Sequence, residues 1–301
     1  MNSQNTKSQH FGYAAIVGEP NAGKSTLVNA LLKQKVTIVT PKVQTTRFRV
    51  QGIYVEGNAQ MVLVDTPGLF APKTRLDKAM VKSARDGFDA ADIAIFLIDL
   101  KSKQSAQQIF DVLSKTRAPD RKLYVLNKSD IVKQDVIDAV KQAIVAQDAN
   151  AEIHVISALR GMGVDELRSR VMQLLPQAPW HYPEDQLTDI SERLLAAEIT
   201  REQIFLQLSQ ELPYGIHVDT EKWEDYKNGS VKIDQAVIIA REAHKPIVLG
   251  KGGTQIKKIR EAAQAEMQKI FDRPVHLFLF VKVREDWAEN KAFYKDMGLE
   301  F

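Results

Sequence analysis

The sequence predicts a two-domain α/β protein, in which a mainly parallel sheet with helices on both faces precedes a smaller α+β domain. Short apolar segments alternate with amphipathic segments over roughly the first 175 residues, which is typical of a parallel sheet with crossover helices. A proline-rich stretch then interrupts the pattern, and the order of elements changes after it. The length of 301 residues also exceeds what most single cores reach.

The expected elements of the first domain follow one another in a regular order. Buried strands are expected at residues 13–17, 61–64, 93–99, 123–126 and 152–156, and helices at residues 23–32, 77–89, 105–116 and 132–146. Residues 51–56 are expected to pair antiparallel with the strand at 61–64 through a turn at Gly57. Such a sheet binds its ligands at the carboxyl ends of the strands.

A break near residue 176 divides the chain. Residues 176–183 hold three prolines, which a helix does not tolerate. We therefore expect a tail at residues 1–10, a first domain at 11–176, a linker at 177–189 and a second domain at 190–301. The elements expected in the second domain are a helix at 190–210, strands at 215–226 and 231–241, a helical stretch broken by glycines at 247–271, a strand at 275–283 and an amphipathic segment at 287–297.

Composition excludes several functional classes. The chain has no cysteine, which rules out disulfides and thiolate metal sites and fits a reducing cytoplasm. Its six histidines are scattered, and no segment approaches the roughly 20 apolar residues of a membrane span. The first ten residues lack the apolar core of a signal peptide. The net charge of +3 is too small to indicate a partner.

A phosphate-binding loop lies between the first expected strand and the first expected helix. It reads Gly18-Glu19-Pro20-Asn21-Ala22-Gly23-Lys24-Ser25, followed by Thr26. The two glycines let the backbone wrap around phosphates with its N–H groups pointing inward. Lys24 should reach the β- and γ-phosphates, and the Ser25 hydroxyl should ligate Mg²⁺.

A second motif identifies the base. Asn127-Lys128-Ser129-Asp130 follows the strand at 123–126. The Asp130 carboxylate can accept two hydrogen bonds from the ring N–H and the exocyclic amine of guanine, and adenine has no such donor pair. Ser157-Ala158, after the last strand, should supply a backbone contact that supports guanine recognition. The expected ligands are therefore GTP and GDP.

Two further segments should complete this site. Asp65-Thr66-Pro67-Gly68 follows the strand at 61–64, so Asp65 should hold the Mg²⁺ shell and the N–H of Gly68 should bond the γ-phosphate. A threonine of the polar stretch at residues 40–47 should complete the Mg²⁺ coordination. We favour Thr46, which directly precedes Arg47, although spacing leaves Thr45 open. Lys24, Thr46 and Gly68 are the expected catalytic groups.

The second domain carries a glycine-rich loop, Gly250-Lys251-Gly252-Gly253. Residues 243–260 include five lysines or arginines and no acidic residue, although residues 185–301 together have 17 basic and 20 acidic side chains. This local patch suits phosphate. The expected RNA-binding residues are Gly250, Lys251, Gly252, Gly253, Thr254, Lys257 and Lys258. On the strand at 275–283, Phe278 and Phe280 share a face with His276 and Lys282, where they either stack on bases or lie buried under helices.

These motifs carry a family resemblance. In their order, the nucleotide motifs resemble those of translation-factor-class GTPases, and residues 247–259 resemble the core of a type II KH domain, which clamps single-stranded RNA at a GXXG loop. Together they resemble the Era family of bacterial ribosome-assembly GTPases. The resemblance runs from Phe11 to about Trp287 and includes Gln44-Thr45-Thr46-Arg47 and residues 182–189.

The resemblance implies a GTP-hydrolysing switch that needs Mg²⁺, binds 16S rRNA near its 3′ end and assists maturation of the small ribosomal subunit. It also implies peripheral attachment to the inner membrane in some members, and no DNA partner. Leu69 stands where Ras-like proteins place the glutamine that orients the attacking water, so slow intrinsic hydrolysis is expected. Asn21 matches an asparagine that helps to hold K⁺ near the phosphates in GTPases with this substitution.

Two other classes are alternatives. One is a metabolic or transport NTPase, which the guanine turn disfavours and which a comparison of ATP and GTP binding would test. The other is a membrane-signalling GTPase whose second domain binds protein or lipid. We expect instead that GTP and Mg²⁺ order Thr46 and the loop after Gly68, and that this ordering controls RNA binding.

Overall fold

A computed structural model describes residues 8–40, 42, 50–65, 82, 88–102, 104–113, 119–208, 212–285 and 287. Several predictions lie outside these residues: Thr45, Thr46, Arg47, Thr66, Pro67, Gly68 and Leu69, most of the helix expected at 77–89, and the segment 287–297 apart from Trp287. The described residues form two compact units. The larger extends to Asp189, the smaller begins at Ile190, and a short stretch near residues 38–40 groups with the smaller unit.

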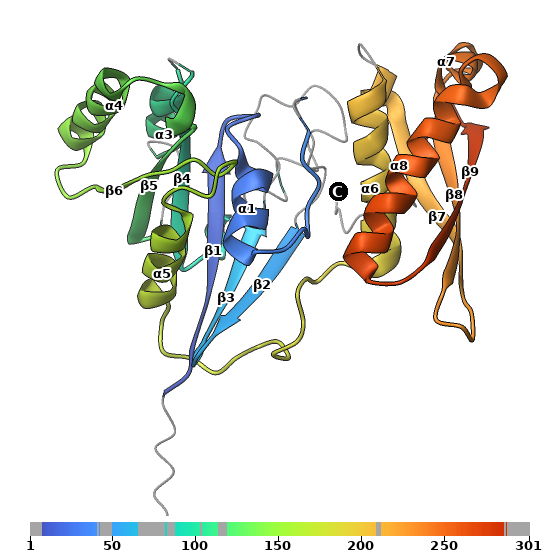
Figure 1. Cartoon of the computed structure of the whole chain (residues 1–301). Coiled ribbons are helices and arrows are strands. Elements are labelled where there is room, and N and C mark those ends of the chain that lie inside the picture. Colours follow the sequence, from blue (N-terminus) through green and yellow to red (C-terminus); the bar gives the residue numbers. More distant parts are fainter. Residues whose placement is uncertain are drawn as a thin grey trace, which may run out of the picture. The chain divides into compact units, whose positions relative to one another are not determined.

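The larger unit is built on one sheet with the strand order β2-β3-β1-β4-β5-β6 among the described residues (Figure 1). The antiparallel pair is β2 with β3, and the remaining neighbours run parallel. The strands are β1 (His10–Gly18), β2 (Val50–Glu56), β3 (Ala59–Asp65), β4 (Ile93–Asp99), β5 (Arg121–Asn127) and β6 (Glu152–Val155). The mainly parallel sheet predicted from the alternation of segments is confirmed.

Helices cover both faces of this sheet. On one face, α1 (Lys24–Leu32) and α5 (Val164–Leu174) pack against alternate strand residues such as Ala14 and Ile16. On the other face, α3 (Ser105–Leu113) and α4 (Gln134–Gln147) pack with Ala15 and Val17. Because both faces are buried, the strands are apolar at nearly every position rather than at every second one. Polar functional side chains can therefore lie at the carboxyl ends of the strands, which the helices do not cover.

Two features differ from the sequence prediction. Helix α5 was not predicted; it follows Gly163, whose φ is +70° and where a Cβ would lie 2.6 Å from the carbonyl oxygen of Val155. Strand β1 begins at His10, a residue expected to belong to the tail. His10 pairs with Ala59 in the sheet and bridges to Gln177, so its backbone is held on both sides.

The segment predicted as a linker, residues 177–189, packs against the edge strand β2. The backbone N–H of Ile53 donates to the carbonyl of Leu187 at 2.9 Å, and the N–H of Asp189 donates to the carbonyl of Gln51 at 3.3 Å. The Tyr182 hydroxyl also donates to the Gln51 side chain at 2.8 Å. This segment therefore satisfies backbone groups that an edge strand would otherwise expose.

The smaller unit holds a second sheet with the order β7-β8-β9 among the described residues. Its elements are α6 (Glu192–Gln207), β7 (Ile216–Asp225), β8 (Val231–Ile239), α7 (Lys245–Leu249), α8 (Thr254–Phe271) and β9 (Val275–Val283). β7 and β8 are antiparallel, whereas β8 and β9 are parallel. Buried residues of α6 and α8 pack on one face of this sheet. The predicted order helix, strand, strand, helix, GXXG, helix, strand is confirmed.

Among the described residues, no helix is both long enough and apolar enough to cross a bilayer.

Candidate guanine-nucleotide and RNA sites

The phosphate-binding loop joins β1 to α1. Gly23 caps the helix with φ +98°, a left-handed conformation that favours glycine, and Asn21 also has a positive φ of 65°. The Lys24 ammonium donates to the carbonyl oxygens of Gly18 at 3.1 Å and Glu19 at 2.9 Å, so it lies inside the loop. Burial lowers the pKa of Lys24 to about 8, while the charges of Asp65 and Glu19 act in the opposite direction.

A hydroxyl and a carboxylate meet at the end of β3 beside this loop. Ser25 Oγ donates to Asp65 Oδ2 at 2.8 Å, and Asp65 is fully buried. Mg²⁺ bound to a nucleotide uses one or two protein oxygens together with phosphates and water rather than a cage of carboxylates. No group of three or more candidate ligands occurs among the described histidines and carboxylates, and the Ser25–Asp65 pair fits the sparse arrangement that Mg²⁺ uses.

Thr37 belongs to the same cluster, although no motif in the sequence indicated it. Its hydroxyl donates to Asp65 Oδ2 at 2.9 Å, and the residue is only 4 % exposed. Asn29 of α1 fixes the local chain, because its Oδ1 accepts the backbone N–H of Val36 at 3.0 Å and of Thr37 at 3.1 Å. Thr37 therefore contacts the predicted Mg²⁺ carboxylate shortly before the polar stretch that includes Thr46.

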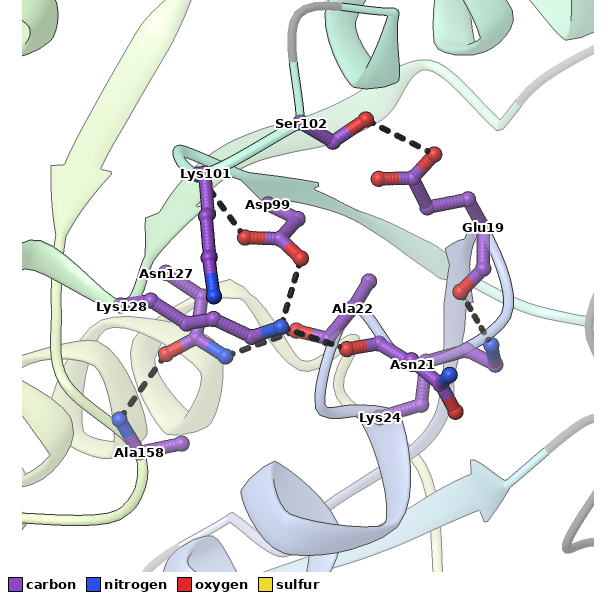
Figure 2. Close-up of polar contacts among 10 residues, drawn as sticks. All are labelled: Glu19, Asn21, Ala22, Lys24, Asp99, Lys101, Ser102, Asn127, Lys128 and Ala158. Carbon is purple, nitrogen blue, oxygen red and sulfur yellow. Dashed lines mark hydrogen bonds and ion pairs between the residues drawn. The ribbon is translucent and has the colours of Figure 1, made fainter. Parts of the chain in front are cut away.

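The predicted guanine turn is bound to the phosphate loop by side chains (Figure 2). The Asn127 Nδ2 donates to the carbonyl of Ala22 at 2.8 Å, and its Oδ1 accepts the backbone N–H of Ala158 at 2.9 Å. Lys128 Nζ donates to the carbonyl of Asn21 at 2.7 Å. A single asparagine thus joins three segments that are far apart in sequence: the phosphate loop, the guanine turn and the loop after β6.

Asp130 and Ser157 lie in the two loops that follow β5 and β6. Asp130 lies in a 3₁₀ turn, Ser129–Ile131, directly after β5, and its side chain keeps 17 % of its surface exposed. Ser157 is fully buried and accepts the N–H of Arg160 at 3.2 Å, which closes the loop beneath Ala158. Of the predicted nucleotide site, the structure therefore brings together the phosphate loop, Asp65, the guanine turn and the Ser157–Ala158 pair.

The glycine-rich loop of the smaller unit connects α7 to α8. Gly250, Gly252 and Gly253 have φ values of +72°, +59° and +77°, so three of its four residues adopt backbone conformations that side chains disfavour. A Cβ at Gly250 would lie 2.7 Å from the Cβ of Gln255, whereas Gly252 and Gly253 face open space. The backbone is therefore accessible at the last two glycines.

Basic side chains lie in this loop and in the first turns of the helix that follows it. Lys251, Thr254, Lys257 and Lys258 are exposed, and an open hollow of about 530 Å³ borders Gly250 and Lys251. On β9, Phe278 is 46 % and Phe280 50 % exposed, so the alternative that helices bury both rings is wrong. On the same strand, Val275 and Leu277 are each 1 % exposed and belong to the core of the smaller unit.

Fold and site together define the class: a phosphate-loop GTPase joined to a KH domain. A family model described as 50S ribosome-binding GTPase matches residues 13–128, and a KH domain model matches residues 211–288.

Curated relatives match nearly the whole chain. GTPase Era of Caulobacter vibrioides is 45 % identical over 310 residues, covering 98 % of both chains. GTPase Era of Rhizobium meliloti is 49 % identical over 294 residues, covering 96 % of this chain and 93 % of its own. The chain belongs to the Era family of GTPases.

Solved structures agree with this assignment. A crystal structure of Era in complex with MgGDPNP and nucleotides 1506–1542 of 16S ribosomal RNA superposes with a TM-score of 0.88 at 36 % identity, covering 96 % of this chain and 99 % of that one. A single-residue variant of Aquifex aeolicus Era bound to GDP·AlF₄⁻ superposes with the same TM-score, identity and coverage.

Proposed function

We propose that this GTPase binds 16S rRNA near its 3′ end through the glycine-rich loop and assists maturation of the small ribosomal subunit under control of GTP. The observation that supports the proposal is that one chain combines two loop arrangements. Asn127 and Lys128 bind the guanine turn to the phosphate loop, and an open, basic loop with positive φ values lies between α7 and α8. A solved relative of the same fold was crystallised with MgGDPNP and 16S rRNA nucleotides.

At the nucleotide site, Asp130 accepts the two N–H groups of guanine and Asn127 holds the surrounding loops in place. The Lys24 ammonium exchanges the carbonyls of Gly18 and Glu19 for phosphate oxygens, whose negative charge favours its protonated form. Ser25 and Asp65 hold Mg²⁺, which neutralises charge on the phosphate oxygens when it is bound. We assign the γ-phosphate side of the site to Thr46 and Gly68, which lie outside the described residues.

Hydrolysis should be slow and should depend on a cation. Leu69 cannot orient a water molecule, so the residue at this position does not perform the task that glutamine performs in Ras-like proteins. Asn21 is the residue that we assign to K⁺. Its backbone carbonyl accepts the Lys128 ammonium, which leaves its exposed side chain as the group that contacts the ion.

At the RNA site, the phosphodiester backbone passes over Gly252 and Gly253, where no side chain obstructs it. Lys251, Lys257 and Lys258 supply the positive charge, and the first turn of α8 supplies backbone N–H groups. Phe278 and Phe280 offer exposed rings on which bases can stack. The lysines contribute affinity for RNA phosphates, and the aromatic rings and the glycine-rich loop favour single-stranded over double-stranded RNA.

The proposal is tested with an RNA oligonucleotide of the 16S 3′ end, titrated against the full chain carrying GDP or a non-hydrolysable GTP analogue. We expect tighter binding with the analogue. The double variant Lys251→Asp with Gly252→Asp should abolish RNA binding and keep GDP binding. Lys269→Asp is the matched control, because Lys269 is a lysine with a 78 % exposed side chain in the last turn of α8, at the opposite end of that helix from the loop. Unchanged RNA binding in the double variant would refute the proposed RNA site.

Equal RNA affinity with both nucleotides would refute control by GTP while leaving both sites intact. Peripheral attachment to the inner membrane is a separate proposal that rests on the family resemblance. It is tested by co-sedimentation of the full chain with vesicles of anionic lipid, and a chain that stays in the supernatant would refute it.

A further inference from the structure

Asp99 is a buried carboxylate next to the nucleotide site that the sequence motifs do not include. It is the last residue of β4, and the parallel register places it beside Asn127, the last residue of β5. It is 7 % exposed. Its Oδ2 accepts the Lys128 ammonium at 2.5 Å, and its Oδ1 accepts the backbone N–H of Lys101 at 2.9 Å (Figure 2).

Lys128 has an unfavourable backbone conformation and a flexible side chain, and Asp99 fixes the position of its ammonium group. Its φ is +69°, a left-handed value that costs free energy in a residue with a side chain. The residue that it contacts in the phosphate loop, Asn21, also has a positive φ of 65°. A lysine stem is flexible and loses rotamer freedom when its ammonium is fixed at one place. The carboxylate of Asp99 holds the ammonium where it reaches the carbonyl of Asn21.

The turn after β4 makes a second contact with the phosphate loop. Ser102 Oγ donates to Glu19 Oε2 at 3.2 Å, and the backbone N–H of Ser102 donates to the carbonyl of Asp99 at 3.0 Å. The N–H of Leu100 also donates to the carbonyl of Asn127 at 3.1 Å. Residues 99–102 thus contact the phosphate loop at Glu19 directly and at Asn21 through Lys128.

We propose that Asp99 is a positioning residue of the nucleotide site. It fixes Lys128 in the strained turn and so joins the segment that reads guanine to the loop that holds phosphate. The inference deepens the proposed nucleotide site and does not depend on RNA. A neutral partner would hold Lys128 against Asn21 less firmly, because a hydrogen bond between two ionised groups is stronger than one between an ammonium and an amide.

The test replaces Asp99 by asparagine, which keeps the shape and one acceptor oxygen and removes the charge. We expect release of a fluorescent GDP analogue from the full chain to become about tenfold faster, the scale of one charge-assisted hydrogen bond. The nucleotide-free chain should also lose some thermal stability, because the ion pair is largely buried, so GDP release is the readout that identifies a positioning role. In a Lys128→Met background, Asp99→Asn should have almost no further effect on GDP release, because the ammonium on which it acts is absent.

Asp148→Asn is the matched control. The carboxylate of Asp148 accepts a hydrogen bond from the Lys122 ammonium at 3.1 Å. Lys122 lies at the start of β5, and the guanine turn follows the end of that strand. This variant should lower the melting temperature and leave GDP release unchanged. The proposal is overturned if Asp99→Asn leaves GDP release unchanged. It is also overturned if Asp99→Asn lowers the melting temperature as Asp148→Asn does and its effect on GDP release adds fully to that of Lys128→Met. Normal GDP binding by a Lys24→Ala variant would count against the nucleotide site itself rather than against Asp99.

Discussion

The side-chain nitrogen of Asn127 lies so close to Gly23 that a Cβ at position 23 would be 2.5 Å from it. The same nitrogen donates to the carbonyl of Ala22 at 2.8 Å. Position 23 is also the cap of α1, with φ +98°. Glycine is therefore required there for two independent reasons, the backbone conformation and the approach of the guanine turn. This contact makes the phosphate loop and the base-reading turn one structural unit.

We predict that Gly23→Ala weakens GDP binding strongly. The methyl group must displace Asn127 or distort the loop, and a disfavoured backbone of this kind costs about 1–3 kcal/mol, or roughly 5- to 150-fold in affinity. Calorimetric titration with GDP measures the effect. Gly57→Ala is the control, because Gly57 has φ +64° in the β2–β3 turn and nothing within 4 Å of its added Cβ. The control should lose some thermal stability and keep its GDP affinity; equal affinity in both variants would contradict the prediction.

We predict that Ser25→Ala removes most of the gain in GTP-analogue affinity that Mg²⁺ provides. The hydroxyl that lies 2.8 Å from Asp65 would no longer be available as a ligand, while the loop backbone would still bind phosphate. Affinity is measured with Mg²⁺ and with a chelator. Ser169→Ala is the control, since this exposed hydroxyl of α5 donates to the carbonyl of Asp165 within its own helix. A full response to Mg²⁺ in Ser25→Ala would exclude Ser25 as a ligand.

The motifs from which the sequence predicts the nucleotide site are local. Gly18–Ser25 and Asn127–Asp130 each lie directly after an apolar strand, and parallel pairing brings strand ends together. The sequence places Asp99 at a strand end but does not indicate a role for it, because the register of β4 and β5 brings it to its partner Lys128. Thr37 was missed because nothing local distinguishes it, and only the folded chain places its hydroxyl against Asp65.

Helix α5 and the attachment of residues 177–189 could not be predicted either, because both depend on tertiary contacts. The apolar stripe of helix α5, Leu167 and Val171, is completed only by the sheet that the helix covers. The prolines predict a linker at residues 177–189, and the structure contains no helix there. Their attachment to β2 uses backbone groups of Leu187 and Asp189, and backbone pairing leaves no signature in side-chain composition.

We predict that Asn21→Gly abolishes stimulation of GTP hydrolysis by K⁺. Glycine accepts the positive φ of position 21 and keeps the carbonyl that Lys128 contacts, so the loop should retain its form. Hydrolysis is measured in potassium and in sodium salts of equal ionic strength. Wild type should be faster in K⁺, whereas the variant should be equally slow in both and keep its GDP affinity. K⁺ stimulation that persists in the variant would show that another group holds the ion.

We predict that the Lys122–Asp148 pair contributes stability that is lost in acid. The hydrogen bond from Lys122, supported by Tyr124, holds the pKa of Asp148 below its usual range. A carboxyl with a depressed folded-state pKa stabilises the fold at pH values above its unfolded pKa, roughly 4, and this contribution fades as the pH falls through the folded pKa. At neutral pH, Asp148→Asn should therefore cost about 0.5–1 kcal/mol, a value that allows for the partial exposure of the pair.

The measurement is thermal unfolding of wild type and Asp148→Asn from neutral pH down to roughly pH 3, a range that spans the ordinary aspartate pKa. The difference between them should shrink at the acidic end, because the wild-type carboxyl becomes protonated and its bond to the lysine weakens. Asp138→Asn is the control, since Asp138 accepts a hydrogen bond from Gln134 on the exposed side of α4 and should change stability little at any pH. A difference that stays constant with pH would mean that Asp148 acts through shape and neutral hydrogen bonds rather than through its charge.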